Sequence, residues 1–162
     1  MDNLYTKISL NYVITIQPSE INKNINKVLL KKLKKNLEGK CISEGFIKPN
    51  SIVITGRSLG IAQASHFNGN VMYHINYVAD ICNPLEGDIV TAKINNINKM
   101  GALATAGDGD IQPLNILLAK QHHIDNKDFD KLKIDDDIKV KILGKRFDSG
   151  ESQISIIGVL DN

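Results

Sequence analysis

Residues 85–102 read Leu-Glu-Gly-Asp-Ile-Val-Thr-Ala-Lys-Ile-Asn-Asn-Ile-Asn-Lys-Met-Gly-Ala, and this stretch decides the fold class of the second half of the chain. Residues 88–97 alternate between two faces, which is the period of a half-buried strand. The two faces are Ile89, Thr91, Lys93 and Val90, Ala92, Ile94. A second strand-like run, residues 99–106, follows with almost no gap. The stretch therefore predicts two consecutive strands of a β domain.

The residues that follow extend this pattern to five strands. Gly107-Asp108-Gly109-Asp110 is a strong turn signal. Three further strands are predicted at residues 111–118, 138–143 and 153–159. A loop at residues 125–137 carries six aspartates and three lysines. Five short strands at this spacing favour a small Greek-key barrel of the oligonucleotide-binding (OB) type.

The first half of the chain predicts a strand followed by a helix. Residues 8–16 alternate, and Pro18 ends the strand. The helix is expected over residues 20–38, with Ser19 as its N-cap and Gly39 as its C-terminal cap. Its apolar stripe consists of Ile21, Ile25, Val28, Leu29, Leu33 and Leu37. Most lysines of the helix lie off this stripe, so they form a nucleic-acid patch or, as we favour, a solvated face or a surface for an acidic partner.

Two more strands, residues 51–55 and 70–79, complete the first half. Residues 56–69 between them are expected as an extended loop or irregular strand. Asn83-Pro84 marks the division into an N-terminal domain, residues 1–83, and a barrel domain, residues 84–162. The fold class is therefore α+β.

Composition narrows the possible functions. An apolar share of 42% and a charged share of 23% are typical of a soluble globular protein. The chain has no apolar run of membrane-spanning length and no secretory signal pattern at its start, so we expect an intracellular protein. Cys41 and Cys82 are expected as small buried side chains. The formal charge is +5 for residues 1–83 and −3 for residues 84–162, so the barrel lacks the basic excess of a dedicated nucleic-acid binder.

Four ordered segments resemble one protein family. Residues 85–102 look like the opening of the barrel repeated in the largest small-subunit ribosomal protein. Within them, Asn98-Lys99-Met100-Gly101 resembles the family formed by the seventh subunits of eukaryotic RNA polymerase II and their archaeal equivalents. Three further segments fit the same family, in order along nearly the whole chain. They are residues 37–41, residues 73–87, and residues 142–148 with 154–158. The bias toward Ile, Asn and Lys resembles that of proteins encoded by A/T-rich genomes, including those of some parasites and large DNA viruses.

The resemblance implies a non-catalytic stalk subunit of a multisubunit DNA-directed RNA polymerase. In that family the N-terminal half is a truncated ribonucleoprotein-like α/β domain that docks on the polymerase core, and the OB barrel projects toward the exiting transcript. The family also implies a small helical stalk partner, of the type of the fourth subunit of RNA polymerase II or its archaeal counterpart. By position the docking tip falls on Gly56, Arg57, Ser58, Leu59 and Gly60. An arginine there suits a fixed interface pair better than a lysine does.

The barrel itself predicts weak RNA binding. Its second and third strands lack the aromatic side chains on which bases stack. Any binding is expected to be salt-sensitive and to rest on Lys99, His122, His123, Lys145 and Arg146. The paired histidines are alternatively ordinary loop or strand-end residues. If viral, the protein is expected in virions or host cytoplasm; if eukaryotic, in the nucleus; if archaeal, in the cytoplasm.

No catalytic or cofactor site is expected. The chain has no phosphate-binding loop, and Gly107-Asp108-Gly109-Asp110 lacks the ligand spacing of a calcium site. The cysteines and histidines have no zinc-ligand spacing, so no metal site is expected either. The alternative function is a free-standing OB-fold RNA-binding module in translation or RNA turnover.

Overall fold

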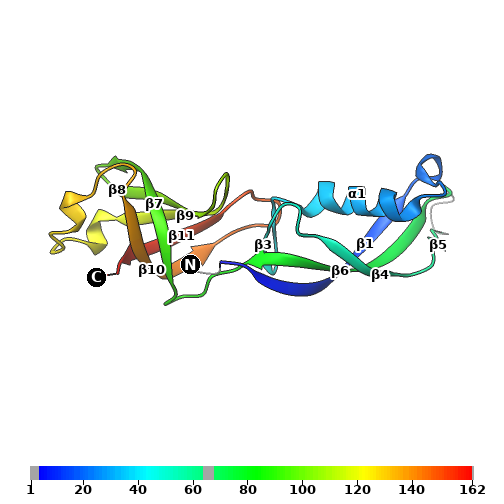
Figure 1. Ribbon diagram of the computed structural model, residues 1–162, viewed down its shortest axis with the longest axis horizontal. Helices are drawn as coiled ribbons and strands as arrows, with labels where there is room; N and C mark the ends of the chain where they lie inside the picture. The colour runs from blue at the N-terminus through cyan, green and yellow to red at the C-terminus, as the bar shows by residue number, and fades with distance from the viewer. Residues whose placement is uncertain (1–3, 64–67, 162) are drawn as a thin grey trace.

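The computed structural model describes residues 4–63 and 68–161, and it shows an elongated molecule whose two parts lie end to end along the long axis (Figure 1). The first part is a six-stranded sheet with one α-helix, and the second is a closed five-stranded barrel. Within the described residues, no helix has the length and apolar character needed to cross a membrane.

The N-terminal sheet is built around its longest strand. β6 (Val71–Cys82) pairs with β1 (Thr6–Ile16), β3 (Gly45–Ile47), β4 (Val53–Arg57) and β5 (Ile61–Ala62). The two-residue β2 (Cys41–Ile42) pairs with β3. The strands predicted at residues 8–16, 51–55 and 70–79 are thus confirmed, with β6 running three residues further. The likeness of this half to a ribonucleoprotein domain stays a prediction.

Helix α1 (Ile25–Leu37) covers one face of the N-terminal sheet (Figure 1). Its buried residues Leu29, Leu33 and Leu37 pack against the inward-facing side chains of β1 and β6. The predicted 3.6-residue periodicity is confirmed within α1, whereas Ile21, the first residue of the predicted stripe, precedes the helix and is 45% exposed.

The helix begins five residues later than expected. Pro18–Glu20 form a short 3-10 helix (η1), so Ser19 is not the N-cap of α1. The Asn22 side chain accepts a hydrogen bond from the Asn24 backbone N–H at 2.8 Å, and Asn24 becomes the N-cap. An asparagine that bonds nearby backbone stabilises a turn in competition with the helix, which explains the delayed start.

The barrel has the strand order β10-β11-β9-β8-β7. β9 and β11 are parallel, whereas the other neighbours are antiparallel. This arrangement fits an OB fold, as the sequence predicted. The five strands are β7 (Ile89–Asn98), β8 (Gly101–Asp108), β9 (Ile111–Ala119), β10 (Asp137–Arg146) and β11 (Ile154–Leu160). The predicted loop between β9 and β10 also holds two 3-10 turns, η2 (Lys120–His122) and η3 (Phe129–Lys131).

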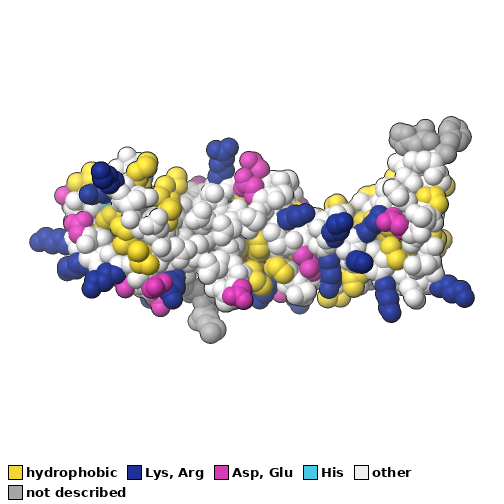
Figure 2. All heavy atoms as spheres, turned by 90° about the horizontal axis from the view of Figure 1, so that it is seen from above, with side chains coloured by type: hydrophobic (Ala, Val, Ile, Leu, Met, Phe, Trp, Pro, Cys, Tyr) yellow, Lys and Arg dark blue, Asp and Glu magenta, His cyan; other side chains and the backbone are white. Residues whose placement is uncertain are grey.

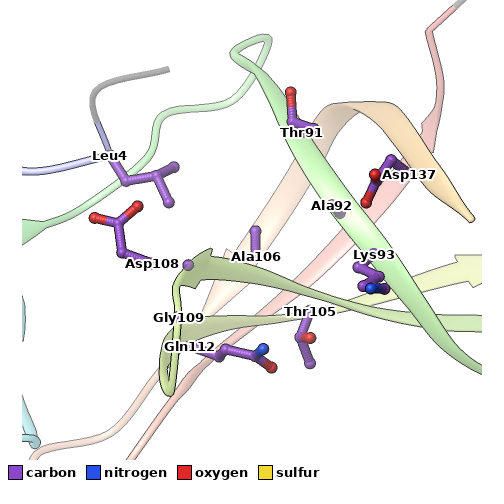
Figure 3. A pocket seen from close by; sticks show the side chains of 11 residues that line it. Leu4, Thr91, Ala92, Lys93, Thr105, Ala106, Asp108, Gly109, Gln112 and Asp137 are labelled. Atoms are coloured by element: carbon purple, nitrogen blue, oxygen red, sulfur yellow. The ribbon is translucent and has the colours of Figure 1, made fainter. Parts of the chain in front are cut away.

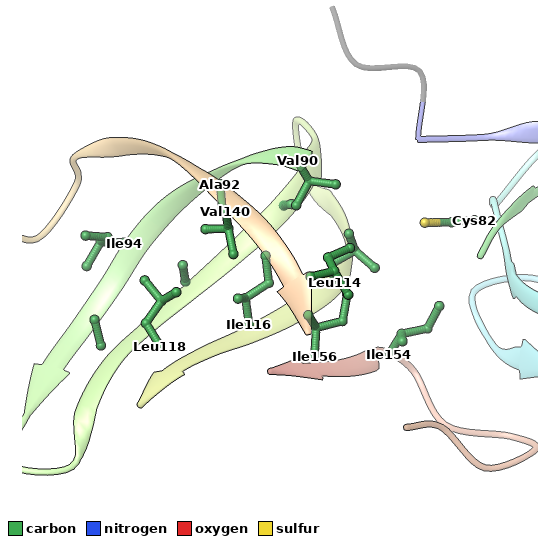
Figure 4. Packing of buried hydrophobic residues seen from close by; sticks show 14 of the residues in the cluster. Cys82, Val90, Ala92, Ile94, Leu114, Ile116, Leu118, Val140, Ile154 and Ile156 are labelled. Atoms are coloured by element: carbon green, nitrogen blue, oxygen red, sulfur yellow. The ribbon is translucent and has the colours of Figure 1, made fainter. Parts of the chain in front are cut away.

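The hydrophobic core of the barrel extends into the N-terminal half. Alongside barrel residues such as Leu114 and Ile154, the cluster contains Cys41, Phe46 and Cys82 from the sheet. Figure 4 places Cys82 at the side of the cluster near Ile154. Both cysteines are buried, at 1% and 0% exposure, and neither forms a disulfide, so the prediction of small buried side chains is confirmed.

Polar contacts fasten the same junction. The Cys41 backbone N–H donates to Glu151 O at 2.7 Å, and Gly150 N–H donates to Cys41 O at 2.9 Å. The Lys48 ammonium lies 3.7 Å from the Asp108 carboxylate and 4.8 Å from the centre of the Tyr5 ring. The two parts therefore share both packing and backbone hydrogen bonds. The division into two domains at residues 83/84 stays a prediction, and the hydrophobic core is continuous across it.

Candidate functional surfaces

The predicted docking segment lies at the extremity of the molecule opposite the barrel. Gly56 and Arg57 end β4, and Ser58 to Gly60 lead into β5. Arg57 pairs with Ile75 and Ile61 with Met72, near the start of β6, whereas Cys82 at the other end of β6 belongs to the barrel cluster. Figure 1 shows β5 at one end and the barrel at the other. Residues 64–67 of the loop predicted at 56–69 lie outside the described residues.

Arg57 is exposed yet held in place. Its Nε donates a 2.6 Å hydrogen bond to Asn26 Oδ1 on α1, and Nη1 donates to Ser58 O at 3.2 Å. The guanidinium carbon lies 5.6 Å from the centre of the Tyr73 ring, close enough for a cation–π contact. Since these contacts fix the side chain, binding a partner carboxylate would cost little further ordering.

The rest of the segment is pinned to β6 and presents an apolar side chain. Ser58 N–H donates to His74 O at 2.8 Å, and Ser58 Oγ accepts from His74 N–H at 3.0 Å. A Cβ on Gly60 would approach Val71 and Tyr73 at 2.5–3.0 Å, so only glycine fits without a shift. Leu59 is 84% exposed between these two anchors. A fixed loop with an exposed leucine beside an ordered arginine is suited to contact another protein.

A groove beside this segment was not foreseen from the sequence. It has a volume of about 770 Å³ and lies between α1 and β4. Leu30, Ile52 and Ile54 supply apolar lining, and Asn26 and Arg57 lie along it. The sequence gives no sign of this groove because its lining residues are far apart in the chain. Only the packing of α1 across the sheet brings them together.

The residues predicted to face RNA do not form one patch. Lys99 and His122 lie at the end of the barrel away from the sheet, where Gly101 pairs with Ala119. Arg146 pairs with Ser155 at the opposite end, one register position from the Ile154–Leu114 pair. Strand register therefore separates the five predicted residues into two groups.

His123 is a structural residue in this fold. It is 5% exposed and its ring stacks on Phe129 with centroids 4.4 Å apart. Its Nε2 accepts a hydrogen bond from Leu160 N–H at 3.0 Å, so the proton of the neutral ring resides on Nδ1, which donates to Ala119 O at 2.8 Å. His123 thus ties the end of β11 to the end of β9. Of the predicted pair, His122 is the exposed one.

Lys145 is also engaged within the protein. Its Nζ donates to Pro84 O at 2.9 Å and to the side-chain oxygen of Asn83. These contacts join β10 to the segment that connects the two halves. Lys99, His122 and Arg146 remain exposed, so they are the predicted RNA-facing residues with the most free surface.

The outer wall of the barrel has an aliphatic hollow of about 480 Å³. Leu103, Leu117 and Ile157 line it, with Lys145 and Arg146 among its other lining residues. None of its lining residues is aromatic, so it offers no stacking platform for bases.

A second, more polar hollow lies between β7, β8 and the start of the chain (Figure 3). Asp108 lies near Leu4, whereas Asp137 lies across from it, paired in register with Lys93. The two carboxylates therefore do not face one another, as acid–base chemistry would need. Among the described residues, no three His, Cys, Asp or Glu side chains gather closely enough to hold a metal ion.

Comparison with known proteins gives relatives over most of the chain, although no family model matches. The architecture places the chain in the class of two-part proteins with an OB-type barrel. The relatives narrow this class to subunits of RNA polymerases. The chain is 26% identical over 159 residues to "DNA-directed RNA polymerase II subunit RPB7" of Glycine max, covering 91% of this chain and 88% of that protein.

Two further relatives agree with the first. "DNA-directed RNA polymerase II subunit 7" of Arabidopsis thaliana is 26% identical over 162 residues, covering 90% of this chain and 87% of that protein. A "Putative DNA-directed RNA polymerase subunit" of Acanthamoeba polyphaga mimivirus is 24% identical over 166 residues, covering 98% and 82%. The chain therefore has homologues among the seventh subunits of RNA polymerase II and a viral polymerase subunit, and the resemblance inferred from the sequence is confirmed.

Proposed function

We propose that this chain is a subunit of a multisubunit DNA-directed RNA polymerase and acts as its non-catalytic stalk. The alignment of 91% of the chain with a polymerase subunit of similar length supports the first part. In this role the segment of residues 56–60 docks on the core subunits, a small helical protein completes the stalk, and the OB barrel lies near the emerging transcript. The protein would then be found wherever its polymerase works.

The observation that carries the proposal is the position of the docking segment. It lies at the extremity opposite the barrel, and a shared core with Phe46 and Cys82 joins the two parts. Because the junction is packed and hydrogen-bonded, fixing one end on a large enzyme also fixes where the other end lies. A strut of this shape suits a protein that positions a barrel at a distance from its anchor.

Contact with RNA is proposed as a minor contribution. The exposed residues among those predicted to contact RNA are divided between two ends of the barrel, and 13 acidic residues outnumber 10 basic residues in positions 84–162. Few phosphate contacts and no stacking platform give weak, salt-sensitive binding.

The docking test uses Leu59, which is exposed and makes no core contact. Leu59→Glu places a charge in the proposed interface, and we expect the tagged full-length chain to lose copurification with the polymerase core. Ile124→Glu is the matched control, because Ile124 is 79% exposed on the barrel, and it should copurify normally. Arg57→Glu should act like Leu59→Glu. Normal copurification of Leu59→Glu would contradict the docking assignment.

The RNA contribution is measured by single-stranded RNA binding at several salt concentrations. We expect affinity to fall steeply between low and physiological salt. An isolated monomer that binds RNA tightly at physiological salt, together with no copurification of the unmodified chain, would instead favour a free-standing RNA-binding module.

A further inference from the structure

The outer edge of β1 is open. β1 pairs with β6 through eleven consecutive residue pairs with no register shift, and no strand among the described residues lies on its other side. The open edge therefore presents a regular row of backbone donors and acceptors. Such a row is a template for another strand.

Native proteins guard long open edges, and β1 lacks the usual guards. Charged residues, prolines and bulges normally interrupt an edge strand. Residues 8–16 contain no charged residue, no proline and no glycine, and they are rich in β-branched and aromatic types. Apart from Lys7 near its start, β1 thus has an unguarded stretch of nine residues, and such an edge is suited to being covered by another chain.

One hydrogen bond shows which backbone groups face outward. Lys32 Nζ on α1 donates to Thr15 O at 3.3 Å, so the Thr15 carbonyl points away from β6. Backbone groups alternate in direction along a strand, and the N–H and C=O of one residue point to the same side. The N–H and C=O groups of Asn11 and Val13 therefore also face the open edge.

A positively charged groove runs along this edge. It has a volume of about 770 Å³ and lies between residues 12–15 of β1 and the α1 side chains Val28, Lys31, Lys32 and Lys35. Lys32 is paired with Glu20 at 2.7 Å, and this hydrogen bond lowers the pKa of the Glu20 carboxyl. Lys31 and Lys35 form no ion pair with any described residue. Figure 2 shows dark-blue side chains along the half of the molecule that carries α1.

We propose that the open edge of β1 and the lysines Lys31 and Lys35 bind an extended acidic segment of another protein subunit, which adds a strand to the sheet. The inference rests on the proposed function for the source of that segment, a second subunit of the polymerase. The β1 edge supplies the affinity through main-chain hydrogen bonds, and the lysines select carboxylates on the added strand. Charge complementarity thus specifies the partner.

A protein segment fits this groove better than RNA does. Outward-facing residues of a strand recur about every 7 Å and present both a donor and an acceptor. Another peptide backbone matches both groups in one ladder, whereas the phosphates of RNA only accept hydrogen bonds, so the strand's carbonyls would depend on the 2′-hydroxyl groups for donors. The lysines alone would attract either partner, so the strand edge decides between them.

The first test examines the polymerase complex that contains the tagged full-length chain. Hydrogen exchange at the Val13 and Thr15 amides should slow by about tenfold or more relative to the isolated chain, as expected when each gains a hydrogen bond. A carbodiimide that joins amines to carboxylates should link Lys31 or Lys35 to an Asp or Glu of another subunit. Unchanged exchange at both amides, or ultraviolet cross-linking of this lysine pair to RNA instead, would overturn the inference.

The second test needs no polymerase. The probe is a fluorescent peptide of alternating threonine and glutamate, compared with its threonine–lysine counterpart. We expect the glutamate peptide to bind the isolated full chain about tenfold more tightly than the lysine peptide. Equal binding of the two peptides would show that the segment is not acidic.

Matched variants separate the strand edge from the lysines. Val13→Pro removes one outward N–H at an edge position where proline is tolerated, and Val13→Thr keeps it. Val13→Pro should weaken the glutamate peptide about tenfold while Val13→Thr binds normally. Lys31→Glu with Lys35→Glu should abolish the peptide preference, whereas Lys34→Glu, on α1 but outside the groove lining, should preserve it. Failure of the unmodified chain to copurify with a polymerase would contradict the proposed function alone. The peptide-binding measurements would still decide whether the β1 edge binds an acidic strand.

Discussion

The two halves of the molecule treat their backbone edges in opposite ways. The barrel closes on itself, so each of its five strands has a neighbour on both sides. The N-terminal sheet leaves β1, β2, β4 and β5 with pairing on one side only among the described residues. Closure removes strand edges, whereas an open sheet exposes them to other chains. The comparison teaches that backbone pairing is complete in the barrel, whereas the N-terminal sheet has open edges, where we propose that a partner binds.

The charges divide along the same line. Residues 1–83 carry a formal charge of +5, with six lysines at positions 23–35, and residues 84–162 carry −3. Electrostatic attraction to the proposed acidic partner would therefore act on the open half. The closed half carries the acidic loop at residues 125–137, which weakens its attraction for nucleic acid.

The largest expected effect concerns Phe46, which belongs to the N-terminal half by its position in the chain but packs in the core of the barrel. Phe46 is 3% exposed on β3 and lies in the barrel cluster. Phe46→Ala should lower the free energy of unfolding by about 3–5 kcal/mol, because it removes a buried aromatic side chain and leaves a cavity. Urea unfolding measured by circular dichroism gives this value.

A control distinguishes shared from local destabilisation. Leu33→Ala removes a fully buried side chain from the other cluster, with an expected loss of about 2–5 kcal/mol. Hydrogen exchange should speed up in both halves for Phe46→Ala but mainly in residues 4–82 for Leu33→Ala. Protected barrel amides in Phe46→Ala would mean that the halves are energetically independent.

Barrel closure is tested next at Gly101. This residue has φ of +148°, and a Cβ there would clash with Leu118 O on the neighbouring strand β9. Gly101→Ala should destabilise the protein by about 3 kcal/mol through backbone strain and crowding. The matched control is Gly144→Ala, whose Cβ would meet nothing within 4 Å, with an expected change within about 0.5 kcal/mol. Similar thermal stability for the two variants would refute the requirement for glycine at residue 101.

A smaller effect is expected where His123 ties β11 to β9. His123→Ala leaves the Leu160 N–H and Ala119 C=O without these partners, and it removes the stacking on Phe129. The expected loss is about 2 kcal/mol of unfolding free energy. His122→Ala changes an exposed neighbour and should stay within about 0.5 kcal/mol. Equal effects of the two substitutions in thermal unfolding would show that the buried His123 contributes no more stability than the exposed His122.

The smallest effect concerns the thiols at the junction, and it appears only at high pH. Burial raises the pKa of Cys41 to about 11 and of Cys82 to about 12 from an ordinary value of 9.0. Because the unfolded chain loses these protons first, the thiols contribute stability below pH 9 that is lost as pH rises toward 11–12. Thermal unfolding temperatures should therefore fall between pH 8 and pH 10.

A variant lacking both thiols separates them from the buried tyrosines. Burial also raises the pKa of Tyr77 to about 12 and raises that of Tyr5, so these groups contribute in the same direction. Cys41→Ala with Cys82→Ala should lose less stability than the unmodified chain over this pH interval. An identical loss would assign the whole effect to the tyrosines.

Strong periodicity made most of the fold predictable. The five barrel strands were found within about three residues at either end, since one face of each strand is buried and the other is exposed. The helix was found as well, but its start was missed, because the Asn22 turn competes locally with the apolar stripe. β2 and β3 were missed because strands of two and three residues are too short to show a period.

The candidate site was less predictable than the fold. Leu59 is exposed, and the docking role of residues 56–60 stays a prediction. The contacts of Arg57 with Asn26 and Tyr73 join residues distant in sequence, so no local pattern indicates them. Two neighbouring positions also differ in exposure, because His122 is exposed and His123 is buried. Adjacent residues in a turn point in different directions, and sequence alone does not say which one faces inward.

The sequence by itself determined the strands, the helix, the charge difference between the halves and the likeness to RNA polymerase subunits. Periodic burial and net charge are properties of local sequence, so they can be obtained without a fold. Only the tertiary structure decided that the barrel core includes Phe46 and Cys82, that the predicted RNA-facing residues separate, and that the β1 edge is open beside Lys31 and Lys35. These features arise from strand order and from contacts between distant residues, which no local pattern records.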